Sequence, residues 1–372
     1  MSLKNRSVQL FLALFRSGLW GTRLECDSFA DDVDWDMIFQ LAGHQTVNGI
    51  IADGLVQLPI ELRPDREHFY KMLMRVSRIE DANRKMNRII PRLFNYLSEA
   101  GCSPFLLKGQ GIGLAYMCPE HRQSGDIDVF IGFDENSNEC ANRAMRRIAS
   151  DIGENNRERR HAEYTVGGVS VEIHGTIRSS VSRHCNRHFG AWAAERMEED
   201  EPRRAVIDGR EVLLPSYRFD VVFIFVHLLG HFLGGGIGLR QVCDWMMFLH
   251  TYRNKISQSD LEKDLERLGL RRFWEVFASM AVCHLGFPVE EMPYYDCRND
   301  KKGTFLLKRI FATGNFGALQ KEKQLKGNVN KYRKKLVTLF GQIPVYVGNF
   351  PLFPKDTMYC FYVFVRNALK VL

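Results

Sequence analysis

The sequence predicts an α+β protein in which a small module with a mixed sheet is flanked by helical N-terminal and C-terminal regions. Strand-like runs and turn glycines concentrate between residues 101 and 215. On both sides of that stretch, apolar residues recur at the helical spacings of three and four. Hydrophobic residues make up 45% and charged residues 26% of the 372, an ordinary globular balance. The predicted division is a helical region over 1–100, an α/β module over 101–215 and a mostly helical domain over 216–372.

The first region contains one strongly patterned helix. Between Asp65 and Ile90, apolar residues such as Phe69, Met72 and Val76 follow the spacing of one helix face. Pro91 lacks a backbone N–H, so the sequence predicts that the helix kinks or restarts there.

At Gly101 the sequence pattern changes from helical spacing to short strand-like runs. The expected order is a strand over 104–108, a glycine turn over 109–111, a short helix over 112–117, a polar loop over 119–124 and a second strand over 126–132. A helix over 138–152 follows, and then a hairpin of 163–166 and 169–173 around Gly167–Gly168. These elements define the α/β module.

The last region is predicted to be helical over 219–232, 239–250, 258–268 and 273–285, with a final helix from Asp356. Its longest apolar run, 221–229, is interrupted by His227 and is too short to span a bilayer. We therefore expect no transmembrane segment. Nothing in the sequence indicates the oligomeric state.

The cysteines and the charge distribution indicate the cellular location and the possible partners. The nine cysteines are scattered without a CxxC pair, which favours reduced thiols and a cytoplasmic location. Much of the formal charge of +7 lies in KEKQLKGNVNKYRKK, residues 321–335. Such a run is most often a solvated segment and less often a patch for nucleic acid or an anionic surface. Nucleic acid stays open as a partner, although no other feature indicates it.

The stretch GDIDVFI, residues 125–131, combines two carboxylates with a strand that is otherwise apolar. Side chains alternate along a strand, so Asp126 and Asp128 share one face while Ile127 and Val129 share the other. Two like charges on one face repel each other unless a cation lies between them. Replacing either carboxylate by its amide should then leave the metal-free protein as stable as before or slightly more stable. The alternative is a strand with two solvated carboxylates.

The surrounding order of motifs favours the metal site. A glycine turn after Lys108 exposes backbone N–H groups that can hold phosphate oxygens. Arg122 precedes the two aspartates and can neutralise phosphate charge, the alternative being a surface arginine. Glu172 stands on a later strand and supplies a third carboxylate for a divalent ion.

This order resembles the nucleotidyltransferase fold of the DNA polymerase β superfamily, in which a glycine motif, a DxD strand and a third acidic residue follow one another. More closely, LLKGQGIGLAYMCPEHRQSGDIDVFI, VSVEIHG and LLPSYRFDVVFIFVHLLGHF with LRQVCDW are similar to a bacterial nucleotidyltransferase family of the NTP-transferase 5 type. The resemblance covers roughly residues 65 to 250. It implies the polymerase β-like fold and transfer of a nucleoside monophosphate from an NTP to an unidentified hydroxyl-type acceptor, with release of pyrophosphate.

The resemblance also assigns residues. Asp126, Asp128 and Glu172 would be the catalytic carboxylates and would bind Mg²⁺ or Mn²⁺. The nucleotide-binding residues would be Lys108, Gly109, Gln110, Gly111, Arg122 and Gly125. Two positions depart from the superfamily pattern, because Gln110 replaces a serine or glycine and Glu172 replaces an aspartate. The alternative function is a catalytically weakened module that binds nucleotide or a partner protein.

Five further residues are expected to support the site. His174 shares a strand face with Glu172 and either assists the metal site, contacts phosphate or is a polar strand residue satisfied by water. His227 and His231 share a helix face, and we favour histidines hydrogen-bonded inside the bundle over a metal site, since Leu228 stands where a zinc protease needs glutamate. Arg240 and Asp244 are expected to pair with each other or with a substrate.

Overall fold

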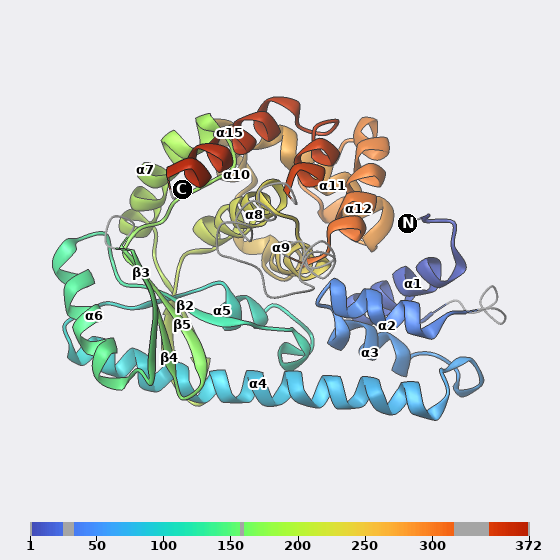
Figure 1. Ribbon diagram of the computed structural model, residues 1–372, viewed down its shortest axis with the longest axis horizontal. Coiled ribbons are helices and arrows are strands. Elements are labelled where there is room, and N and C mark those ends of the chain that lie inside the picture. Colours follow the sequence, from blue (N-terminus) through green and yellow to red (C-terminus); the bar gives the residue numbers. More distant parts are fainter. Residues whose placement is uncertain (1, 25–32, 157–159, 316–341, 371–372) are drawn as a thin grey trace.

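In the computed structural model, which describes residues 2–24, 33–156, 160–315 and 342–370, a five-stranded mixed sheet occupies the middle of the chain (Figure 1). β2 and β5 run parallel, and the other neighbouring strands pair antiparallel. This confirms the predicted α+β class with a mixed sheet. The strands, in the spatial order β1-β2-β5-β4-β3, are β1 (Phe105–Leu107), β2 (Asp126–Phe130), β5 (Val169–His174), β4 (His161–Val166) and β3 (Asp151–Asn156).

The hairpin of β4 and β5 is confirmed. Gly167 and Gly168 both have positive φ, 57° and 73°, as the turn of a two-residue hairpin requires. β3 was not predicted. The helix expected over 138–152 is α6 (Glu135–Ile148), and the chain then enters β3. Since β3 is an edge strand whose first three residues are exposed, its polar sequence carries no alternation that would reveal a strand.

The two faces of the sheet differ in chemistry. Ile127, Val129, Val171 and Ile173 point to one face and belong to an apolar core that they share with α6 and with the second half of α4 (Arg66–Glu99). The opposite face carries Asp126, Asp128 and Glu172, as the alternation predicts. Because helices cover the apolar face, the carboxylates are left to face the rest of the protein.

α4 is the longest helix of the described chain and runs along the lower edge in Figure 1. It continues through Pro91, so the predicted restart at that residue is wrong. The first half of α4 contributes Met72 and Val76 to a second, larger core, while the second half supports the sheet.

This larger core unites the N-terminal and C-terminal helices. Gly18 and Gly54 let α1 and α3 cross closely, since a Cβ on Gly18 would lie 1.9 Å from the carbonyl oxygen of Ile50. The helices are α1 (Arg6–Trp20), α2 (Trp35–His44), α3 (Asn48–Val56), α7 (Arg183–Glu199), α8 (Tyr217–Gly234), α9 (Leu239–Tyr252), α10 (Gln258–Arg267), α11 (Arg271–Leu285), α12 (Asp300–Thr313), one over 342–349 and α15 (Pro354–Lys370).

Several smaller elements complete the chain. The hairpin of β6 (Arg203–Ile207) and β7 (Arg210–Leu214) forms a separate two-stranded sheet that was not predicted. Short 3₁₀ turns are η1 (Ile60–Leu62), η2 (Pro119–His121), η3 (Arg253–Lys255), η4 (Val289–Glu291) and η5 (Cys297–Asn299). The short helix expected over 112–117 begins and ends earlier, as α5 (Gly109–Gly113), so the residues expected as a glycine turn form the start of this helix. The basic run 321–335 lies outside the described residues, and the three-region division stays a prediction.

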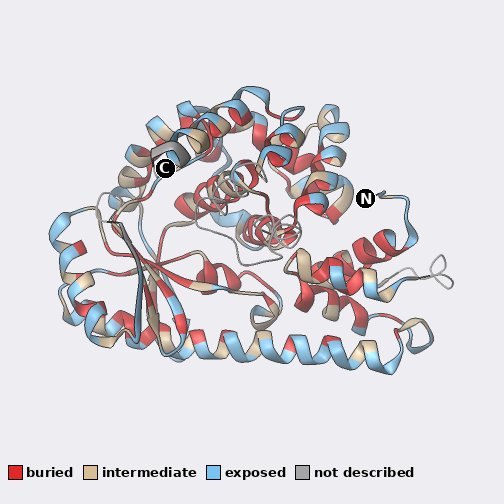
Figure 2. Ribbon diagram, in the orientation of Figure 1, coloured by how far each residue is buried: buried red, intermediate tan, exposed pale blue. Residues whose placement is uncertain are grey.

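α8 lies in the middle of the larger core, where Figure 2 shows it mostly buried. Among the described helices it is the one that is long and apolar enough to cross a membrane by length and composition. However, 67% of that stretch is buried inside the protein, as in the central helix of a folded core. We read α8 as a core helix whose two histidines, His227 and His231, line a cavity together with the carboxylates of the sheet.

Candidate active site

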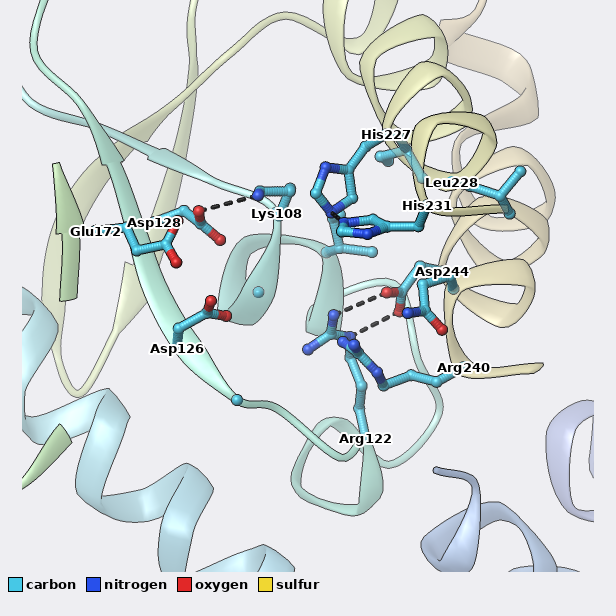
Figure 3. A pocket seen from close by; sticks show the side chains of 15 residues that line it. Lys108, Arg122, Asp126, Asp128, Glu172, His227, Leu228, His231, Arg240 and Asp244 are labelled. Carbon is cyan, nitrogen blue, oxygen red and sulfur yellow. Dashed lines mark hydrogen bonds and ion pairs between the residues drawn. The ribbon is translucent and has the colours of Figure 1, made fainter. Parts of the chain in front are cut away.

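A cavity of about 260 Å³ separates the polar face of the sheet from α8 and α9. Figure 3 shows the acidic residues of β2 and β5 on one side of it and the arginines on the other. Eleven of the predicted site residues line this cavity: Lys108, Gly109, Arg122, Gly125, Asp126, Asp128, Glu172, His227, His231, Arg240 and Asp244. The fold therefore brings together residues that are up to 136 positions apart, from Lys108 to Asp244.

The three predicted carboxylates form one cluster. Asp128 and Glu172 are register partners on the parallel strands β2 and β5, and Asp126 lies two residues before Asp128 on the same face. One carboxylate oxygen from each residue lies within 4.8 Å of the other two. Burial and the nearby charge of Asp128 raise the pKa of Asp126 to about 6. The repulsion expected from the sequence is thus present at Asp126.

Asp128 is placed differently from Asp126, because protein cations already contact it. Its side chain is 3% exposed, and its Oδ1 lies 2.9 Å from Lys108 Nζ and 2.8 Å from His174 Nε2. Burial raises the pKa of Asp128, but the Lys108 charge and the His174 hydrogen bond outweigh it, and the net pKa is lowered. His174 correspondingly has a raised pKa: burial opposes its charge, and its bonds to Asp128 and Glu172 prevail.

Glu172 has two imidazole partners. Its Oε2 lies 3.2 Å from His161 Nε2 and 3.4 Å from His174 Nε2, and these contacts lower its pKa. His161 was not among the site residues predicted from the sequence. The signal was the hairpin itself, because the Gly167–Gly168 turn sets His161 directly opposite His174.

The glycine turn lies against the DxD strand, as predicted. A Cβ on Gly109 would lie 3.4 Å from the carbonyl oxygen of Asp126, and Gly109 has a φ of 43°. Lys108 also has positive φ, 47°, which is strained for a residue with a side chain. This backbone directs the Lys108 ammonium to Asp128.

Gln110 and Gly111 do not line the cavity, although both were expected to bind nucleotide. Gln110 is 8% exposed and its amide nitrogen donates to Asn83 and Asn87 of α4, at 3.2 and 2.9 Å. Gly111 packs against β7, since a Cβ there would lie 2.3 Å from Leu214. The side chain of Gln110 thus anchors the turn to α4, and the nucleotide-binding role of both residues stays a prediction.

Arg122 makes a buried ion pair with Asp244 across the cavity wall. Its Nε and Nη2 donate to the two carboxylate oxygens at 2.7 and 2.8 Å, and Tyr116 donates its hydroxyl to Oδ1 at 2.7 Å. Burial raises the pKa of Asp244, but the Arg122 charge outweighs it and the net pKa is lowered. Asp244 therefore pairs with Arg122, and the predicted pairing of Asp244 with Arg240 is wrong.

Arg240 lines the cavity beside this ion pair (Figure 3). Its guanidinium makes no hydrogen bond or ion pair with any residue in the described part of the chain, although it interacts electrostatically with Asp244 and Asp126. Burial, and next the charge of Arg122, lower its pKa. A guanidinium in this position is suited to an anionic ligand.

His227 and His231 form the wall contributed by α8. Their Nε2 atoms lie 3.1 Å apart, so one imidazole donates to the other, as expected for histidines satisfied inside the bundle. Burial, and next the Lys108 charge, lower the pKa of His231 to about 4 and that of His227 well below its usual range. Both imidazoles are neutral at physiological pH, so they present a polar but uncharged wall to the cavity.

The carboxylate cluster fits a hard divalent cation. Its oxygens converge within 4.8 Å, and the raised pKa of Asp126 records a repulsion that a cation would relieve. Asp126, Asp128 and Glu172 are the residues that would hold such an ion.

Comparison with known proteins identifies a matching family. A family model described as an uncharacterised nucleotidyltransferase matches residues 31–286, which include the whole sheet and the cavity. Comparisons with curated proteins and with solved structures gave no match.

Proposed function

Since this chain belongs to the uncharacterised nucleotidyltransferase family, we propose that it transfers a nucleoside monophosphate from an NTP to a hydroxyl-bearing acceptor. The observation that carries this proposal is the convergence of Asp126, Asp128 and Glu172 beside the glycine turn. The polymerase β-like superfamily, a bacterial source and dependence on Mg²⁺ or Mn²⁺ belong to the same proposal. So does a cytoplasmic location, which the eight described cysteines support because all are free.

In the proposed reaction, the acceptor oxygen forms a bond to the α-phosphorus, and the proton of its hydroxyl group passes to solvent. The bond from that phosphorus to the oxygen bridging to the β-phosphorus breaks, and pyrophosphate leaves. A bound divalent cation would neutralise phosphate charge and lower the pKa of the acceptor hydroxyl. Asp126, Asp128 and Glu172 would hold it, with Glu172 on the acceptor side.

The remaining cavity residues would bind and orient the triphosphate. Lys108 and the backbone of Gly109 lie beside the carboxylates and would contact phosphate oxygens. Arg240 lines the same cavity, and its guanidinium makes no hydrogen bond or ion pair within the described ranges, so it would bind phosphate charge from the opposite wall. Arg122 would act indirectly, because Asp244 already engages its guanidinium.

The alternative is a nucleotide-binding or regulatory module without turnover. One observation favours it: Asp128 already has cationic partners in Lys108 and His174, so the protein satisfies this carboxylate without a metal. Nucleotide binding without transfer to any acceptor would identify this second function.

The test is a screen of labelled NTPs with Mg²⁺ or Mn²⁺ against a cell extract, followed by detection of label on an acceptor. Asp126→Asn or Asp128→Asn should reduce transfer by several orders of magnitude, because each removes a charge that matters most in the transition state. Glu172→Gln should reduce transfer more than NTP binding. Glu163→Gln is the matched control, since Glu163 pairs with Glu172 in register but does not belong to the cluster. Equal transfer by all four variants would contradict the proposal.

A further inference from the structure

A second group of ligand atoms lies directly beside the three carboxylates. It consists of His161, Glu172 and His174, whose candidate ligand atoms lie within 4.8 Å of one another. We propose that these three residues form a mixed nitrogen and oxygen site for a transition-metal ion such as Zn²⁺, distinct in chemistry from the all-carboxylate site. The proposed site shares Glu172 with the carboxylate cluster, so its role in the protein rests on the proposed function.

The fold builds this group by strand register. His161 opens β4 and is the register partner of His174 on β5, so the two imidazoles stand on the same face of the sheet. Glu172 lies two residues before His174 and shares that face. The two rings lie 5.0 Å apart between centroids and flank the Glu172 carboxylate. All three side chains are partly exposed, between 18% and 24%, so an ion can reach them from solvent.

The distances suit a small transition-metal ion. Glu172 Oε2 lies 3.2 Å from His161 Nε2 and 3.4 Å from His174 Nε2. Ligands about 2.1 Å from one zinc ion in a tetrahedron stand about 3.4 Å apart. Both imidazole nitrogens therefore already stand near tetrahedral ligand separations from Glu172 Oε2, and the candidate ligand atoms of the two histidines lie within 4.8 Å of each other.

The donor atoms determine the class of ion. Imidazole nitrogen is a good ligand for Zn²⁺ and its transition-metal neighbours, whereas Mg²⁺ prefers oxygen alone. Asp126 and Asp128 supply only oxygen, while the second group supplies two nitrogens and one oxygen. The structure thus offers two adjoining positions with opposite preferences, and the nitrogen-rich position lies on the Glu172 side proposed for the acceptor.

A simpler function for the imidazoles is to compensate the carboxylate charge in the absence of metal. His174 contacts both Asp128 and Glu172, as such a function requires. Among the three carboxylates, His161 contacts only Glu172. If the imidazoles only compensate charge, their removal should not change the affinity for Zn²⁺ more than the affinity for Mg²⁺. The experiment has to separate these two functions.

The experiment measures Zn²⁺ and Mg²⁺ binding to the metal-free full chain by calorimetry, without nucleotide. His161→Ala should lower Zn²⁺ affinity by more than about tenfold, the loss caused by removing even an indirect partner of a metal ligand. Mg²⁺ affinity should stay as in the unaltered chain. Asp126→Asn should have the reverse effect, lowering Mg²⁺ affinity and sparing Zn²⁺. With Cu²⁺, which imidazole also binds well, as a paramagnetic probe in place of Zn²⁺, pulsed electron paramagnetic resonance should detect nitrogen coupling that weakens in His161→Ala.

The control is His188→Ala, which alters another histidine pair, His184 and His188, whose rings lie 4.6 Å apart on α7. This variant should retain the Zn²⁺ affinity of the unaltered chain. His161→Gln, checked by thermal melting without metal, guards against a folding defect. Unchanged Zn²⁺ affinity in folded His161 variants, or absence of nitrogen coupling, would overturn the site. A chain that shows this Zn²⁺ pattern but never transfers a nucleotide would leave the inference standing and reject the proposed function.

Discussion

Arg122 and Asp244 face each other through two hydrogen bonds of 2.7 and 2.8 Å, although 122 positions separate them in the chain. Arg122 precedes the DxD strand, and Asp244 belongs to α9 of the helical region. The side chains are 3% and 8% exposed, so water screens the pair poorly. This contact fixes the sheet module and the helices that form the opposite wall of the cavity in one relative position.

Breaking this pair should destabilise the protein. Asp244→Asn leaves the Arg122 guanidinium buried without a countercharge, and we expect the free energy of unfolding to fall by about 3–5 kcal/mol. Urea denaturation followed by circular dichroism measures this. The exposed pair of Arg204 and Glu211 is the matched control, and Glu211→Gln should cost less than about 1 kcal/mol. A similar small loss for Asp244→Asn would show that the buried pair does not join the two regions.

Arg240 should matter for ligand binding rather than for stability. Arg240→Gln removes a guanidinium that makes no hydrogen bond or ion pair with the described residues, so NTP affinity should fall by about ten- to a hundredfold, as for a lost charge-assisted hydrogen bond. The melting temperature should stay unchanged or rise, because the charge of Arg122 acts unfavourably on that of Arg240. Arg88→Gln, on the exposed side of α4, removes the same charge and should change neither quantity. Loss of stability with unchanged NTP affinity in Arg240→Gln would assign this residue to the fold.

The two aspartates of the DxD strand should differ in metal-free stability. Asp126→Asn relieves repulsion, so the protein should be as stable as before or more stable. Asp128→Asn removes the shared partner of Lys108 and His174, and the free energy of unfolding should fall. The sequence alone predicts the first behaviour for both residues. Chemical denaturation in the presence of a metal chelator distinguishes the variants, and equal changes would mean that Lys108 and His174 do not stabilise Asp128.

His121 should make stability depend on pH. Its imidazole lies 2.6 Å from Asp53 and 3.1 Å from Glu80, and the bond to Asp53 is the main reason why its pKa is raised. A raised folded pKa gives stability that is fully present below the unfolded pKa of about 6.5 and is lost as pH rises through the folded value.

The free energy of unfolding should therefore fall more between pH 6 and pH 9 in the unaltered protein than in His121→Gln. Asp53→Asn should remove most of the same difference. Parallel curves for the three proteins, measured by urea denaturation, would exclude this ion pair as the source.

The fold class and the carboxylate cluster follow from local patterns. Alternation along GDIDVFI separates the faces of β2, and the Gly167–Gly168 turn fixes the partner of β5. The pairing of His161 with His174 could also have been predicted from the sequence, because His161 lies six residues before Gly167 and His174 lies six residues after Gly168. The register rule for a two-residue hairpin therefore identifies this imidazole without a structure.

Other features depend on contacts that no local pattern encodes. The choice of Arg122 rather than Arg240 as the partner of Asp244 depends on how the loop before β2 meets α9. Gln110 looks like a phosphate-facing residue in the sequence, yet it turns toward two asparagines on α4. The edge strand β3 has no apolar alternation, and its first three residues are exposed to solvent.

The passage of α4 through both apolar cores has a consequence for cooperativity. Met72 and Val76 lie in the core of the terminal helices, while Ile90 and Leu97 lie in the core of the sheet. At about 1.5 Å per residue, the 34 residues form a rod of about 50 Å. If either core unfolds, half of α4 loses its packing contacts. That half is then unstable as a helix, because most of the stability of a protein helix comes from tertiary packing. The two cores should consequently unfold in a single transition rather than as independent units.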